Sequence, residues 1–114
     1  MLFKGGYITG LQLVGIGASA TQVGMKLEQN QRHVLGIVRC NSFYDGFQFT
    51  NGNLSDFQNI SARFNVRHGW YNDGLGVDAN SITVGAMDLS NNGSDGLNFR
   101  EDTAPNVSQQ WSGG

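Results

Sequence analysis

Short runs in which apolar and polar residues alternate recur along this chain, each directly after a glycine. Phe47-Gln48-Phe49 follows Asp45-Gly46, and Leu97-Asn98-Phe99 follows Asp95-Gly96. Gly24 and Gly69 open similar runs, and the four glycines lie 22, 23 and 27 residues apart. A repeat of this length is typical of one supersecondary unit that stacks on the next. The pattern therefore predicts a coil of parallel strands.

Each repeat is expected to hold a longer and a shorter strand joined by a turn. The longer strands are predicted over residues 8–13, 33–40, 57–64 and 81–89, and the shorter ones over 25–27, 47–49, 70–71 and 97–99. Alternation in the short strands places these side chains inside the coil: Met25, Phe47, Trp70 and Leu97 in one column, with Leu27, Phe49 and Phe99 beside it. In the longer strands it predicts these interior residues: Ile60, Ala62, Phe64, Ile82, Val84 and Ala86.

Asparagines occupy matching places in the repeats. Asn41, Asn65 and Asn91 each lie four or five residues before a repeat glycine. Stacked asparagine amides can hydrogen-bond along the axis of a coil, so we expect these three to form a ladder. The longest repeat is expected to carry its extra residues around 91–94.

The sequence thus predicts an all-β fold, a parallel β-helix (β-solenoid) of about four rungs over residues 1–100, followed by a polar C-terminal tail over 101–114. A β-sandwich is the structural alternative, because short strands separated by turns also describe it. The sandwich, however, predicts tight hairpins and gives no reason for a glycine to recur at one place in each repeat.

Composition narrows the functional classes. Seventeen glycines and 14% charged residues argue against a helical domain. The net charge of −2 leaves no basic patch, so no nucleic-acid partner is expected. No apolar run approaches the ~20 residues that cross a bilayer, so no membrane insertion is expected. The single Cys40 lies in an apolar run and should be buried, and the two histidines lack zinc spacing, so neither metal nor cofactor is expected.

The repeats resemble the right-handed parallel β-helix of the pectate-lyase-like superfamily, and within it phage tailspikes and related polysaccharide-degrading proteins. The resemblance rests on the runs 45–49 and 95–99, on the stretch 60–70, and on 80–84 leading to 91–93. It implies a virion or extracellular protein that contacts a bacterial surface polysaccharide. The superfamily includes lyases, hydrolases, epimerases and non-catalytic spikes, so the resemblance does not select one activity.

Members of this superfamily usually have more rungs, a cap on the first rung and often a trimerisation region. About four uncapped rungs would expose strand edges. We therefore expect this chain to be part of a longer solenoid, or to be covered by partner chains in a homotrimer or by other virion chains.

Asp45, His68 and Asp95 occupy the same position on successive rungs and form the candidate catalytic set. Strand spacing would place the two carboxylates roughly 9 to 10 Å apart, with the histidine between them. This lies near the upper end of the ~6.5–9.5 Å separation of an inverting glycosidase. The alternative is structural, because aspartate before glycine is also typical of a tight turn.

The candidate carbohydrate-binding residues lie on the outward side of the short strands. Lys26, Gln48, Tyr71 and Asn98 form one outward column, and Asp73 lies in the next. We expect Gln48, Tyr71, Asp73 and Asn98 to bind sugar, since paired polar groups and an aromatic ring suit its hydroxyls and C–H face. Two hypotheses follow: polysaccharide recognition, with cleavage in a full-length protein, or a non-catalytic assembly solenoid that contacts partner chains. A solvated sheet face would explain the same column without any ligand.

Overall fold

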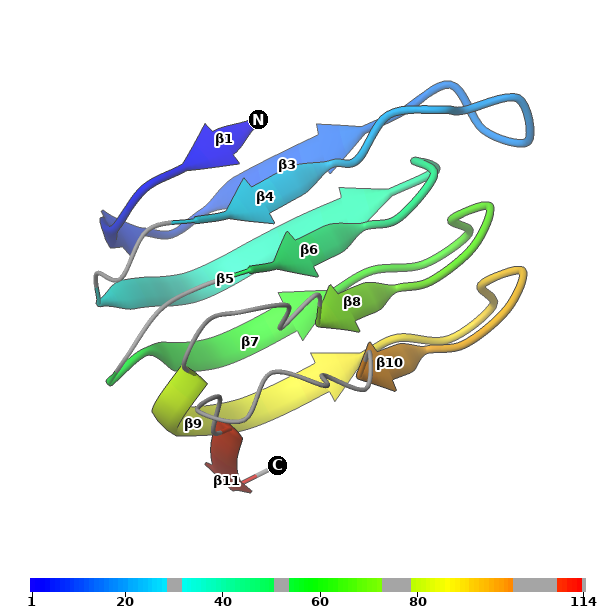
Figure 1. The fold of residues 1–114 in the computed structure, drawn as a ribbon. Coiled ribbons are helices and arrows are strands. Elements are labelled where there is room, and N and C mark those ends of the chain that lie inside the picture. The colour runs from blue at the N-terminus through cyan, green and yellow to red at the C-terminus, as the bar shows by residue number, and fades with distance from the viewer. Residues whose placement is uncertain (29–31, 51–53, 73–78, 100–108, 114) are drawn as a thin grey trace.

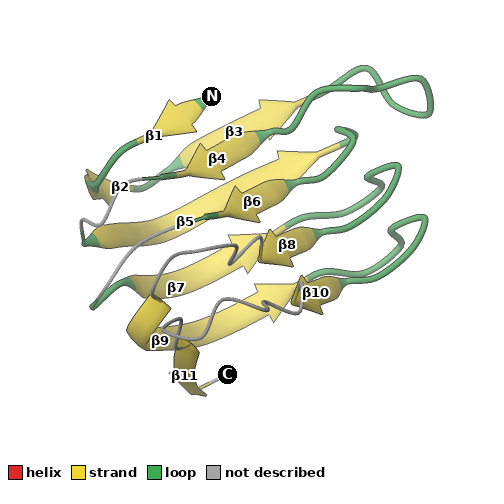
Figure 2. Ribbon diagram, viewed as in Figure 1, coloured by secondary structure: helices red, strands yellow, loops and turns green. Residues whose placement is uncertain are grey.

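The fold was analysed in a computed structural model that describes residues 1–28, 32–50, 54–72, 79–99 and 109–113. The described residues form only strands, turns and loops, with two parallel sheets stacked as a β-solenoid of about three turns (Figures 1 and 2). This confirms the all-β parallel solenoid and is close to the four rungs predicted. Because the described residues form no helix, they include none that could span a membrane.

One sheet has five short strands in the order β1-β4-β6-β8-β10. They are β1 (Leu2–Phe3), β4 (Met25–Leu27), β6 (Phe47–Phe49), β8 (Trp70–Asn72) and β10 (Leu97–Phe99). The other sheet has the order β11-β9-β7-β5-β2, and β3 also pairs with β5. Its strands are β2 (Gly6–Ile8), β3 (Leu11–Val14), β5 (His33–Asn41), β7 (Asp56–Ser61), β9 (Ala79–Asp88) and β11 (Gln109–Gly113). Strand β11 lies within the segment expected as a polar tail, and it pairs in parallel with β9.

The predicted interior column is in register. Met25 pairs with Phe47, Phe47 with Trp70, and Trp70 with Leu97. The first three side chains are fully buried, whereas Leu97, on β10 at the edge of its sheet, is 45% exposed. The Trp70 ring lies 5.0 Å from the Phe47 ring and 4.8 Å from the Phe57 ring, so aromatic stacking fills the middle of the core. Cys40 is also buried, as predicted, and burial raises the pKa of its thiol to about 12.

The recurring glycine is required by the closeness of adjacent turns. The amide of Gly24 donates to the Asp45 carbonyl at 3.0 Å, and that of Gly46 donates to the His68 carbonyl at 3.0 Å. A Cβ placed on Gly46 would lie only 2.7 Å from the carbonyl oxygen of Gly69, and one on Gly24 would lie 2.6 Å from that of Gly46. Only glycine fits at this position of each turn, which explains the repeat in the sequence.

The longer strands bend at one aligned place, and the bend changes which residues face inward. Phe57 and Ile60 are buried, whereas the two residues between them are both exposed. Asn59 pairs with Ala86, and Ile60 pairs with Met87. The interior prediction for Ala86 is therefore wrong: Ala86 is exposed, and Met87 packs against the core in its place. Strict alternation fails because the bend inserts one extra outward residue.

The interior prediction for Phe64 is also wrong. Phe64 is 54% exposed and has a positive φ of 59°. Ser42 and Asn91 adopt the same left-handed conformation, with φ of 65° and 59°. The chain turns at this position on successive rungs, so the strand alternation ends before it.

An asparagine ladder exists, but Asn92 rather than Asn91 belongs to it. The Asn65 amide nitrogen donates to Asn92 Oδ1 at 2.9 Å, and Asn65 Oδ1 accepts from the backbone of Phe43 at 2.9 Å. Asn41 instead accepts from the backbone of Arg63 at 2.9 Å. Asn91 occupies the left-handed position beside the ladder, so the prediction was misplaced by one residue.

The extra residues of the longest repeat do not lie at 91–94. Backbone hydrogen bonds align this stretch with residues 64–67 without any insertion. Phe49 pairs with Asn72 and Asp56 pairs with Thr83, so 6 residues join these strands in one turn and 10 in the next. The insertion therefore lies between Asn72 and Thr83.

Candidate functional site

Four outward side chains form an in-register column on the sheet of short strands. Lys26 pairs with Gln48, Gln48 with Tyr71, and Tyr71 with Asn98. Each of the first three is the middle residue of a three-residue strand whose flanking residues are buried, so it points away from the core. Adjacent members lie one strand spacing apart, about 4.8 Å. We call these four residues the polar ladder.

The three candidate catalytic residues form a second row, at the turn that precedes the polar ladder. The backbone amide of His68 donates to Asp45 Oδ1 at 3.0 Å, and that of Asp95 donates to His68 Nδ1 at 3.3 Å. Asp45 is fully buried and His68 is 7% exposed, whereas about half of the Asp95 side chain is exposed. The structure thus brings the three together in the predicted order, with each side chain accepting from the backbone of the next turn. We call them the turn row.

Contacts within each turn link the turn row to the polar ladder. Gln48 Nε2 donates to Asp45 Oδ2 at 2.9 Å, and Asn98 Nδ2 donates to Asp95 Oδ2 at 2.7 Å. In the turn between them, the rings of His68 and Tyr71 stack 5.4 Å apart. The residue before each repeat glycine therefore orients the ladder residue three positions later.

Arg67 is the central residue of this region, and the sequence gave no indication of its role here. Its Nε donates to Asp45 Oδ1 at 2.9 Å, and its Nη2 donates to Asp45 Oδ2. The guanidinium carbon lies 4.8 Å from the centre of the Tyr44 ring and 4.6 Å from that of Tyr71. Backbone hydrogen bonds align Tyr44 with Val66 and Asp45 with His68, so Arg67 is one extra residue in its turn. The only sequence signal was the change in repeat spacing from 22 to 23 residues.

Hydrogen bonding keeps Asp45 ionised inside the protein. Burial alone would raise the pKa of this carboxyl group, but hydrogen bonds from Arg67, Gln48 and the His68 amide bring the pKa below its ordinary value. The same ion pair raises the pKa of Arg67. Four donors occupy the two carboxylate oxygens. This arrangement favours the turn-stabilising role of Asp45, and a catalytic role for the turn row stays a prediction.

The lowered pKa predicts that acid weakens the fold through Asp45. Because the folded pKa lies below the unfolded value of about 3.9, its contribution is complete above that value and is lost as the pH falls through the folded pKa. We expect Asp45→Asn to flatten the acid limb of a plot of unfolding free energy against pH, measured by urea denaturation. Asp56→Asn is the control, since Asp56 is a partly exposed carboxylate on β7. An unchanged acid limb in Asp45→Asn would contradict the prediction.

The remaining candidate, Asp73, lies outside the described residues. Among the described residues, no group of three or more His, Cys, Asp or Glu side chains is arranged to hold a metal ion. Comparisons with protein-family models, curated proteins and solved structures found no match to this chain. The functional argument therefore rests on the polar ladder, the turn row and Arg67.

Proposed function

We propose that this chain is a polysaccharide-recognition module of a right-handed parallel β-helix similar to those of phage tailspikes and other pectate-lyase-like proteins. Its ligand would be a bacterial surface polysaccharide, and its setting a virion or the extracellular space. The observation that carries the proposal is the in-register polar ladder of Lys26, Gln48, Tyr71 and Asn98. A row of outward groups on a rigid sheet can follow a polymer along several subsites.

The side chains of the polar ladder suit a neutral, hydroxyl-rich ligand. Gln48 and Asn98 each use an amide N–H to bind an aspartate of their own turn. An amide has two N–H donors and an acceptor oxygen, so each keeps hydrogen-bonding capacity after that contact. The contact also fixes the orientation of the amide, which lowers the entropy lost when a ligand binds.

Tyr71 contributes through its hydroxyl and the uncovered part of its ring. Arg67 and His68 already lie against this ring, so part of its surface is covered by protein. These contacts hold the ring in place and leave the residue half-buried. A pre-positioned tyrosine at the centre of the polar ladder is a typical anchor for a ligand.

The proposal predicts that Tyr71→Ala lowers polysaccharide affinity at least about tenfold, which corresponds to about 1.4 kcal/mol of binding free energy. Glycan-array screening would first identify a bound bacterial polysaccharide, and isothermal titration would then compare the variants. Tyr7→Ala is the matched control, because Tyr7 is 63% exposed on β2 of the other sheet. Undiminished binding by Tyr71→Ala would remove the polar ladder as the site.

Cleavage is a separate part of the proposal, tested on the same polysaccharide. Asp95 is the most exposed member of the turn row and therefore the one that substrate can reach. If the turn row acts on the bound glycan, Asp95→Asn should lower the release of reducing ends while binding persists. Unchanged release in this variant would remove Asp95 from the catalytic set.

The alternative function is assembly, in which the solenoid contacts partner chains. Exposed apolar side chains near the turns favour it: Val14 is 65% exposed, Ile16 is 79% exposed and Phe64 is 54% exposed. Such residues are common where a protein surface is covered by a partner. Light scattering after size-exclusion chromatography distinguishes the two readings, since assembly through these residues predicts a discrete oligomer that Ile16→Ser and Phe64→Ser dissociate.

A further inference from the structure

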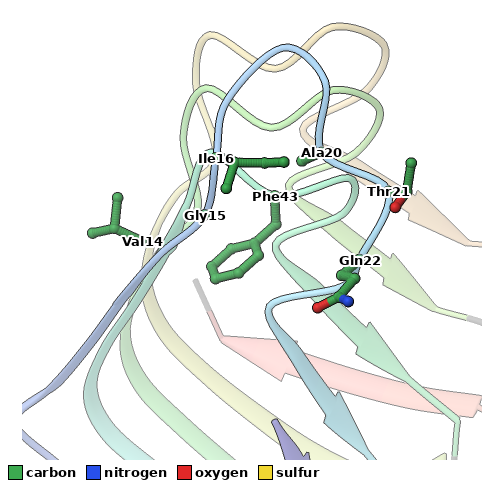
Figure 3. Close-up of a pocket in the computed structure, with 7 residues that line it drawn as sticks. All are labelled: Val14, Gly15, Ile16, Ala20, Thr21, Gln22 and Phe43. Carbon is green, nitrogen blue, oxygen red and sulfur yellow. The ribbon is translucent and has the colours of Figure 1, made fainter.

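The connection from β3 to β4 encloses a hollow beside Phe43. Figure 3 shows the Phe43 ring between the rising arm of this connection, which carries Ile16, and the descending arm, which carries Thr21 and Gln22. The hollow has a volume of about 340 Å³. Its lining residues are Val14, Gly15, Ile16, Ala20, Thr21, Gln22 and Phe43.

Extra residues in the first turn create this space. Val14 pairs with Asn41, and Gly24 bonds to the turn at Asp45, so 9 residues connect these positions in the first turn and only 4 in the second. The surplus arches outward and is held by hydrogen bonds from Gly17 to Ser42 and from Ala20 to Gly17. Phe43 occupies the place that the ladder asparagine Asn65 fills one turn later, and its ring offers no hydrogen bond to draw the arch inward.

The chemistry of the lining selects a neutral ligand with an apolar part. Phe43, Ile16, Val14 and Ala20 supply apolar surface, and Thr21 and Gln22 supply the only polar side chains of the lining. None of the lining residues is charged. Ile16 is 79% exposed and Val14 is 65% exposed, so the chain itself leaves this apolar surface open to water. The volume is at the lower end of the range for small-ligand pockets, about 300–1,000 Å³.

The hollow is continuous with the polar ladder. A second hollow of about 520 Å³ is lined by Lys26, the first member of the polar ladder, and it shares Thr21 and Gln22 with the hollow at Phe43. A ligand that follows the polar ladder past Lys26 therefore reaches Thr21 and Gln22, and beyond them the Phe43 ring. This places an apolar subsite at the end of a polar row.

We propose that the hollow beside Phe43 is a subsite for a methyl-bearing sugar unit of the bound polysaccharide. The methyl group would lie against Phe43 and Ile16, while sugar hydroxyls reach Thr21 and Gln22. A 6-deoxyhexose and an N-acetylhexosamine both carry such a methyl group. The proposal rests on the polysaccharide-binding function and adds the class of sugar that this end of the site accepts.

Matched pairs of free sugars test the subsite directly. Saturation-transfer NMR and titrations would compare L-rhamnose with L-mannose, L-fucose with L-galactose, and N-acetylglucosamine with glucose. We expect the methyl-bearing member of at least one pair to bind about fourfold more tightly, which is the effect of burying one methyl group, with the strongest transfer at that methyl. The first two pairs report a 6-deoxyhexose and the third an N-acetyl group. Equal binding within all three pairs would overturn the proposal.

Two variants on the same loop give the matched control. Thr21→Phe would fill the hollow from its rim and should abolish preferential binding of the methyl-bearing sugar. Ser19→Phe adds the same side chain at an exposed residue that does not line the hollow, and it should retain the preference. Neither substitution touches the buried core, so both proteins should remain folded, which circular dichroism would verify. Unchanged sugar binding in Thr21→Phe would overturn the assignment to this hollow.

The two proposals fail in different ways. If the polysaccharide binds through Tyr71 but Thr21→Phe changes neither its affinity nor its selectivity, the subsite is wrong and the polar ladder stands. If methyl-bearing sugars bind the hollow but Tyr71→Ala leaves polysaccharide affinity unchanged, the subsite stands and the polar ladder is wrong.

Discussion

Replacing Trp70 by alanine is expected to lower the free energy of unfolding by about 3–5 kcal/mol, the range for truncating a buried aromatic side chain. Trp70 is fully buried, and its ring packs on Phe47, Phe49 and Phe57, with centroids between 4.8 and 6.3 Å away. Three adjacent turns meet at this ring, so the cavity left behind cannot close without moving all of them. Urea denaturation followed by circular dichroism measures the loss.

The control for this prediction lies in the same column. Leu97 pairs with Trp70 but is 45% exposed on β10, at the edge of the sheet. We expect Leu97→Ala to cost only about 1 kcal/mol, because little buried volume is lost. Similar losses in the two variants would mean that the aromatic stack is not the centre of the core.

Gly46→Ala is expected to cost at least about 3 kcal/mol, the upper end of the range for overpacking a close-packed interior. The added Cβ would lie 2.7 Å from the Gly69 carbonyl oxygen and 2.7 Å from the Ala62 Cβ. Both atoms are held by neighbouring turns, so relief requires separation of the ladder itself. Thermal and urea unfolding of the variant would show the loss, together with a lower cooperativity if adjacent turns part.

A second glycine separates this clash from ordinary backbone strain. Gly10 has a φ of 70°, and a Cβ built on it meets no atom within 4 Å. Gly10→Ala should therefore show only the cost of a left-handed alanine, about 1–2 kcal/mol. If Gly46→Ala were no more destabilising than Gly10→Ala, the close approach of the turns would not be the reason for the repeat.

The sequence predicted the parts of the fold that depend on the repeat. The column of Met25, Phe47 and Trp70 follows from alternation after each glycine, and the order of Asp45, His68 and Asp95 follows from their shared position. Both depend only on one turn lying over the next in register. Periodicity is sufficient wherever the chain keeps its period.

The errors fall where the period breaks. Ala86 was misplaced because the long strands bend, and Phe64 because the chain turns at a left-handed residue. The contact of Arg67 with Tyr44 and Asp45 joins residues more than 20 positions apart and exists because one residue is added to a turn. The hollow beside Phe43 likewise depends on how an inserted loop folds, and no alternation pattern encodes that.

The turns of this solenoid tolerate differences in length without disturbing the strands they join. The connection from β3 to β4 and the segment between β8 and β9 both carry several more residues than their counterparts, yet β4, β6 and β8 keep their pairing. In Figure 2 the four connections that lead into β4, β6, β8 and β10 emerge from the same side of the molecule. The fold is therefore organised as an invariant frame with interchangeable cassettes: evolution or a protein engineer can diversify recognition by exchanging one loop at a time.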